Sequence, residues 1–223
     1  MFSHRRPKRG AFSGRAFALW LLCPVLAHGQ EATSTQTEAP AQAPWSARAA
    51  VNGYFLKNEA DYLQPTVAAD HGLLHLEGRY NYEGQRTGSL WVGMNLEFGE
   101  TVKFGVTPMF AVVFGDTKGF APGVEWTLSW GPLSLYSEME LVLQLEDSDS
   151  NFFYVWSEVS GQVLPWLRVG MALQRTRAHA EPRLLQWGPL VGAAVWKLSL
   201  SAYWFNPGQS ENQYWVVSLG IAL

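Results

Sequence analysis

The sequence lacks the residues that several structural classes require. Its single cysteine, Cys23, excludes a disulfide framework and a thiolate metal cluster. Charged residues make up only 16% of the chain, against about 25% in a typical soluble domain. The formal charge of −3 argues against nucleic-acid binding, which requires basic patches. In contrast, 48% of the residues are hydrophobic and 11 are Trp, which excludes a disordered chain.

Residues 1–29 have the features of a secretory signal peptide. A basic segment precedes the apolar run 16–27, which is shorter than the ~20 residues of a membrane-spanning helix, and small residues follow. Cleavage would remove five of the 16 basic residues and none of the 19 acidic ones, leaving a formal charge of −8. Residues 30–45 are rich in Ala, Thr, Gln and Pro, which predicts a flexible tether before a domain at 46–223.

From Trp45 onward, apolar and polar residues alternate with a period of two, which predicts β-strands. Turn residues divide this part into twelve segments. The predicted strands are 47–56, 61–69, 73–83, 88–98, 102–114, 121–130, 133–145, 152–163, 166–177, 184–196, 198–205 and 214–223. The connections alternate between tight turns and longer polar loops, so twelve antiparallel strands place both termini on the tight-turn side.

Two all-β architectures produce such alternation. A soluble sandwich turns its apolar faces inward, whereas an antiparallel transmembrane β-barrel turns them outward to lipid. The even strand number, segments of about 10 residues, the asymmetric connections and the Trp and Tyr residues near segment ends favour the barrel. Pro65, Pro108 and Pro189 resist this interpretation because each removes a ladder hydrogen bond. Arg175 and Arg177 face outward and require a strand end that lies clear of the hydrocarbon.

The last ten residues, Tyr-Trp-Val-Val-Ser-Leu-Gly-Ile-Ala-Leu, carry a family resemblance. They resemble the C-terminal assembly signal of Gram-negative outer-membrane barrels, although that signal usually ends in Phe or Trp and this chain ends in Leu223. The resemblance implies a porin-like barrel in the outer membrane, inserted by the outer-membrane assembly machinery and in contact with lipid and lipopolysaccharide. The N-terminal tether is then expected on the periplasmic side. The resemblance of the last ten residues identifies no functional subfamily.

The strand period also predicts which polar side chains face the lumen. Seven acidic residues against three basic ones fall on the inward face, and most lie between residues 74 and 158, whereas the last four strands turn mainly Gly, Ala and Ser inward. The predicted lumen-lining residues are His75, Glu77, Arg79, Asn95, Glu97, Lys103, Glu125, Glu138, Glu140, Glu158 and Arg168, with Glu83 beside them. Long side chains facing small ones would leave a narrow, eccentric, acidic pore or would reach across and fill it.

Three functions therefore remain open. A channel for small solutes would prefer cations because of its carboxylates. A filled barrel, with its charges paired internally, would serve as an anchor or scaffold. A lipid hydrolase would need a nucleophile and a base at the outer face, but Ser157 has no predicted base nearby. The acidic loop 146–151 lacks the Gly and distal Glu of an EF-hand. The sequence thus predicts no catalytic residue, metal site or cofactor.

Overall fold

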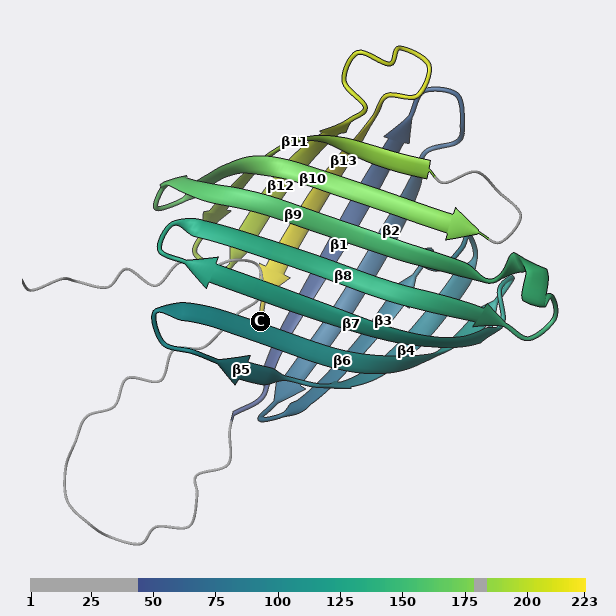
Figure 1. Cartoon of the computed structure of the whole chain (residues 1–223), viewed down its shortest axis with the longest axis horizontal. Coiled ribbons are helices and arrows are strands. Elements are labelled where there is room, and N and C mark those ends of the chain that lie inside the picture. The colour runs from purple at the N-terminus through teal and green to yellow at the C-terminus, as the bar shows by residue number, and fades with distance from the viewer. Residues whose placement is uncertain (1–43, 179–183) are drawn as a thin grey trace, which may run out of the picture.

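The computed structural model describes residues 44–178 and 184–223, and these residues form a β-barrel (Figure 1). The predicted signal peptide, nearly all of the predicted tether and the loop 179–183 lie outside the described residues. No helix in the described part of the chain is long and apolar enough to cross a membrane.

Thirteen strands and one short 3-10 turn follow one another along the chain. The first seven are β1 (Ser46–Leu56), β2 (Tyr62–His71), β3 (Leu74–Tyr80), β4 (Thr87–Met94), β5 (Leu96–Phe98), β6 (Val102–Gly115) and β7 (Gly119–Trp130). The others are β8 (Leu133–Gln144), β9 (Phe152–Leu164), β10 (Leu167–Ala178), β11 (Leu184–Val195), β12 (Leu198–Phe205) and β13 (Tyr214–Ala222), and η1 (Ser148–Ser150) lies between β8 and β9.

The strands close into one antiparallel ring. Apart from β4 and β5, each strand pairs with its neighbour in sequence. β1 pairs with β13 in a continuous register from Arg48–Ala222 to Leu56–Tyr214. β4 and β5 both pair with β6, so they are two parts of one strand interrupted at Asn95. The barrel therefore has twelve strands in the ring, which confirms the predicted fold class. The observed strand ends lie within three residues of the predicted ones.

The two ends of the barrel differ in their connections (Figure 1). At one end, here called the tight-turn end, short turns join the strands. β1 begins at this end and β13 finishes there. At the other, here called the loop end, the connections are longer and more polar. β3 stops at the loop end because Asn81 adopts a positive φ of 59°, which breaks the extended chain.

The outer face of the barrel is apolar and bounded by aromatic residues. Leu63, Val67 and Leu90 are each about 60% exposed on it, as expected of side chains that face lipid. At the tight-turn end Trp130 and Trp196 are exposed, and Trp187 is exposed toward the loop end. A strand rising about 3.3 Å per residue and tilted by about 40° separates Trp187 from Trp196 by about 23 Å along the barrel axis, close to the ~25 Å apolar band of such barrels.

The prolines that seemed incompatible with a closed ring lie where one ladder is interrupted. Pro108 in β6 faces the break at Asn95 between β4 and β5. Pro65 pairs with β1, while the ladder to β3 begins only at Thr66. Pro189 pairs with β10, while the ladder to β12 begins at Leu190. Each proline, which cannot donate a ladder hydrogen bond, thus has a strand partner on one side and an interrupted ladder on the other.

The outward arginine of β10 also has a place in this arrangement. Arg175 pairs with Leu185, which puts it on the loop side of Trp187 and its partner Leu173. The charge therefore lies beyond the aromatic boundary of the apolar band, as the barrel requires. Of Arg177 only the backbone is described, and it pairs with Phe153 still nearer the loop end.

Candidate functional site in the barrel lumen

Arg79 on β3 crosses the lumen to the opposite wall. Its guanidinium forms ion pairs with Glu77 on the same strand and with Glu138 and Glu140 on β8, the last at 3.2 Å. Glu125 on β7 lies 3.5 Å from Nη2. In the ring, three strands separate β3 from β8 by the shorter route: the strand formed by β4 and β5, then β6 and β7. The contacts therefore span the interior, and we call this arrangement the Arg79 bridge.

Aromatic rings enclose the guanidinium of the bridge. The rings of Tyr82 and Trp91 each have their centroid 4.5 Å from Arg79 Cζ, a cation–π geometry that is strongest where water is excluded. The Tyr82 hydroxyl donates to Glu138 at 2.8 Å. Trp91 Nε1 donates to Ser89 Oγ at 2.9 Å. Because the side chain of Arg79 is only 1% exposed, these contacts replace its hydration.

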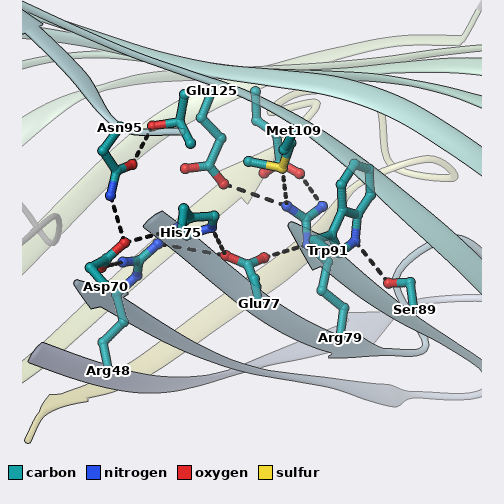
Figure 2. Close-up of polar contacts among 12 residues, drawn as sticks. Arg48, Asp70, His75, Glu77, Arg79, Ser89, Trp91, Asn95, Met109 and Glu125 are labelled. Carbon is teal, nitrogen blue, oxygen red and sulfur yellow. Dashed lines mark hydrogen bonds and ion pairs between the residues drawn. The ribbon is translucent and has the colours of Figure 1, made fainter. Parts of the chain in front are cut away.

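A second polar cluster lies between the bridge and the tight-turn end (Figure 2). Arg48 on β1 pairs with Asp70 at 2.9 Å and with Glu77 at 3.5 Å. His75 Nδ1 lies 2.8 Å from Asp70, and the Asn95 amide donates to the same carboxylate at 2.7 Å. Asp70 thus links β1, β3 and the break between β4 and β5.

A third group involves β9, β10 and β12. Arg168 pairs with Glu158 at 2.6 Å, and Glu158 also accepts from Tyr203 at 2.8 Å and Trp156 at 3.0 Å. Gly192 on β11 makes room for the guanidinium, since a Cβ there would lie 2.7 Å from Arg168 Nε. The ion pair thus depends on a glycine in the neighbouring strand.

Toward the loop end, aromatic side chains fill the interior between β1, β9, β12 and β13. Phe205 is fully buried, and its ring stacks on Tyr214 with centroids 4.9 Å apart. Trp156 meets Phe205 edge-on at 5.4 Å, and Tyr54 stacks on Tyr62 at 4.6 Å. The buried members of this aromatic cluster are Tyr54, Tyr154, Trp156, Ala172, Leu190, Tyr203, Phe205, Tyr214 and Val216.

A cavity of about 260 Å³ remains between these groups and the tight-turn end. Small side chains of β1, β12 and β13, such as Ala50, Ser199 and Ser218, form one wall. The cavity reaches the turn at Trp196 at the tight-turn end, and inward it ends at residues of the aromatic cluster such as Tyr54. The space is thus eccentric, because it lies against the small side chains and beside the Arg79 bridge.

The structure assembles most of the predicted lumen residues. Nine lie in the interior contacts described above: His75, Glu77, Arg79, Asn95, Glu125, Glu138, Glu140, Glu158 and Arg168. Glu97 and Lys103 lie near the tight-turn end on β5 and β6, and both are exposed. Glu83 lies beyond the end of β3 but is 3% exposed and accepts from Ser89 Oγ at 2.5 Å.

Sequence reasoning missed several residues of the site. Arg48 shares the inward face of its strand with Tyr54, a signal that the strand period carries. The predicted strand 61–69 ends before Asp70, but β2 continues to His71, and the Asp70 carboxylate reaches the interior. The expectation that the last strands present mainly small groups holds only near the tight-turn end, since Tyr203 and Phe205 fill the other half.

The hydrolase hypothesis considered Ser157 as a nucleophile, and the structure shows what this serine contacts. Ser157 hydrogen-bonds Ser137 Oγ at 2.8 Å, and the described contacts bring no histidine to it. In the loop 146–151, Asp147 accepts from Ser150, which lowers the pKa of Asp147. Glu146 of the same loop pairs with Lys118. No group of three or more metal-ligating side chains suited to an ion occurs among the described residues.

Comparisons with known proteins place the fold. No protein-family model matches the chain, and no curated protein is similar to it in sequence. A KdgM porin matches with a TM-score of 0.53 and 10% identity, over 79% of this chain and 98% of the porin. A KdgM porin in complex with disordered oligogalacturonate gives 0.54 and 9% over the same shares. The outer-membrane protein Omp33 of Acinetobacter baumannii gives 0.42 and 10%, over 82% of this chain and 99% of that one.

The described residues have the same barrel architecture as the KdgM porins. The likeness to the KdgM structures confirms the fold predicted from the strand period and the C-terminal segment. At about 10% identity it concerns the architecture alone, so the lumen must be interpreted from its own residues.

Proposed function

We propose that the protein is an outer-membrane channel of narrow bore that passes small solutes and prefers cations. The observation that carries this proposal is the eccentric cavity of about 260 Å³, which extends inward from the tight-turn end along the small side chains of β1, β12 and β13. A barrel filled throughout by its side chains would have no such space. A KdgM porin holds oligogalacturonate in a barrel of the same architecture, which supports a solute as the occupant.

The proposed membrane placement follows from the outer surface. The apolar band between Trp187 and Trp196 matches the hydrocarbon core of an outer membrane, with lipid and lipopolysaccharide as its surroundings. Short turns lie on the periplasmic side of such barrels and longer loops outside. We therefore assign the tight-turn end and the N-terminal tether to the periplasm. Insertion by the outer-membrane assembly machinery follows from the C-terminal segment.

The proposed cation preference rests on the balance of buried charge. The cavity lining holds the carboxylates of Glu77, Glu125, Glu138 and Glu158 and the basic groups of Arg48, Arg79, Arg168 and Lys197. The carboxylates of Asp70 and Glu140, which pair with Arg48 and Arg79, raise the count to six carboxylates against four basic groups. A surplus of carboxylates beside a narrow path lowers the energy of a passing cation and raises that of an anion. Passage also requires a change of shape, because the cavity ends at the aromatic cluster.

Single-channel recording of the refolded protein in a planar bilayer, under a salt gradient, tests the proposal. We expect small conductance steps with a cation-selective reversal potential. Glu138→Gln should reduce the selectivity and make openings more frequent, because it removes a carboxylate of the Arg79 bridge. Glu146→Gln, in an exposed loop where it pairs with Lys118, is the matched control and should leave both properties unchanged.

A filled barrel acting as an anchor or scaffold is the second candidate. The observation in its favour is the Arg79 bridge itself, since its ion pairs join opposite walls of the lumen. A correctly folded barrel that stays silent in the bilayer, in wild type and in Glu138→Gln alike, would contradict the channel and favour the scaffold.

A further inference from the structure

Glu125 on β7 is a buried carboxylate with little internal compensation. It is 9% exposed, and its only described polar contact is Arg79 Nη2 at 3.5 Å, the limit of a hydrogen bond. Its other oxygen has no partner in Figure 2, and the side chain lines the cavity. A buried carboxylate is costly unless it is paired and hydrogen-bonded. Glu125 is therefore available to a ligand that supplies a positive charge and a donor.

The neighbouring strand reinforces this demand for positive charge. Glu138 lies directly opposite Glu125 in the β7–β8 register, and like charges in that position repel. Glu138 directs its oxygens to Arg79 and to the hydroxyls of Tyr82 and Tyr136. Glu140 has one buried oxygen without a partner. The charge of Arg79 is thus shared among several carboxylates and does not compensate Glu125 alone.

The lining of the cavity indicates which kind of cation fits. Tyr54, Tyr136, Trp156 and Tyr203 contribute aromatic surface next to the carboxylates. Aromatic faces attract organic ammonium groups through their quadrupole and accommodate apolar carbon. A metal ion would need several oxygen or nitrogen ligands around one point, and the described residues offer no such group of three.

We propose that the cavity is a binding site for a small organic ammonium ion, with Glu125 as its counter-ion and the aromatic side chains around its carbon skeleton. The volume of about 260 Å³ has room for a small organic ammonium ion such as n-butylammonium. The proposal rests on the cation preference proposed above, but it does not require that the barrel conduct.

Calorimetric titration of the refolded full-length barrel in detergent tests this site with three probes of equal length. We expect n-butylammonium to bind, and n-butanol and butyrate to bind at least tenfold more weakly. Glu125→Gln keeps the shape of the side chain and removes its charge, so it should weaken n-butylammonium about tenfold or more. Glu97→Gln is the matched control: Glu97 is exposed and does not line the cavity, so its loss should change affinity less than twofold.

Each alternative result has a distinct meaning. Equal binding of n-butanol, or equal weakening by the two Gln variants, would overturn the proposal in favour of an apolar or nonspecific interaction. Binding of Ca²⁺ without binding of n-butylammonium would overturn it in favour of a metal. If Glu125→Gln fails to fold, competition between n-butylammonium and tetramethylammonium in wild type still tests for one saturable site. Binding without conductance would contradict the channel and leave this site standing, and conductance without binding would do the reverse.

Discussion

The two walls of the lumen obey the same strand alternation but have opposite contents. On β3, β7 and β8 the inward positions hold long charged side chains that meet in the middle, as Arg79 and Glu138 do. On β11 to β13 many hold glycine, alanine or serine, such as Gly192 and Ser218, and the cavity lies against several of them. A barrel of this strand number therefore has no fixed bore. The length of the inward side chains decides whether a sector is closed or hollow.

The contrast also occurs along a single strand. The inward residues of β12 change from Ser199 and Ser201 near the tight-turn end to Tyr203 and Phe205 near the loop end. The change from small to large occurs between Ser201 and Tyr203, two residues apart, and Tyr203 lines the inner part of the cavity. The same backbone thus supports a hollow half and a filled half, because only side-chain volume differs between them.

Removing the cation of the charged wall should lower the stability of the barrel more than any other change considered. Arg79→Met leaves Glu77, Glu138 and Glu140 without their common cation, and removing one partner of a buried ion pair costs about 3–5 kcal/mol of stability. Urea unfolding of the barrel refolded in lipid vesicles measures this loss. Adding Glu138→Gln to Arg79→Met should recover part of it, because one uncompensated carboxylate is removed. If the losses of the two single variants simply add, the bridge is not the coupled unit described here.

Removing an aromatic ring from the filled half should have the second-largest effect on stability. Phe205→Ala removes a fully buried ring, which costs about 3–5 kcal/mol in a well-packed core, with the lower part of that range expected because the adjoining cavity lets the site relax. It should also extend the cavity toward the loop end and raise single-channel conductance. Phe110→Ala, on the outer face where its ring is 47% exposed, should destabilise less and leave conductance unchanged. Equal conductance in both variants would argue against the aromatic cluster as the barrier.

Added side-chain volume should destabilise the charged wall more than the wall of small side chains. A Cβ at Gly123 would lie 2.8 Å from the Trp91 ring, so Gly123→Ala should cost about 1–3 kcal/mol through overpacking. Ser218→Leu instead projects into the cavity and should cost less than about 1 kcal/mol while it lowers conductance. The urea midpoint of unfolding and the single-channel conductance, measured for both variants, distinguish these outcomes. Similar destabilisation by both variants would show that the second wall is as tightly packed as the first.

The smallest effect should come from Glu83, in the segment between β3 and β4. Burial raises the pKa of Glu83, so its ionised form is disfavoured in the folded protein and lowers stability at neutral and higher pH. Glu83→Gln can still accept from Ser89 and Trp91. We expect it to be more stable than wild type at pH 8, and the difference should shrink as the pH falls toward 4, where the carboxyl is protonated in both states. A difference independent of pH would exclude charge as its cause.

The alternation of apolar and polar residues is enough to predict the barrel and which residues lie on its inner face. Strand alternation is local, so residues such as Glu77, Arg79, Glu138 and Glu140 could be assigned to one surface without any knowledge of their distances. The alternating lengths of the connections likewise predict that both termini of the barrel domain lie on the tight-turn side. These features follow from the backbone geometry of neighbouring residues, which a single chain segment specifies.

Which sectors of the lumen are hollow and which are filled could not be predicted from the sequence. Whether Arg79 reaches Glu138 depends on how far apart β3 and β8 stand across the ring, which no local pattern contains. Asp70 lies in the site because β2 extends two residues beyond the predicted strand 61–69. The position of the cavity follows from where long side chains meet short ones across the interior. That is a property of packing between distant strands, and it appears only when the ring has closed.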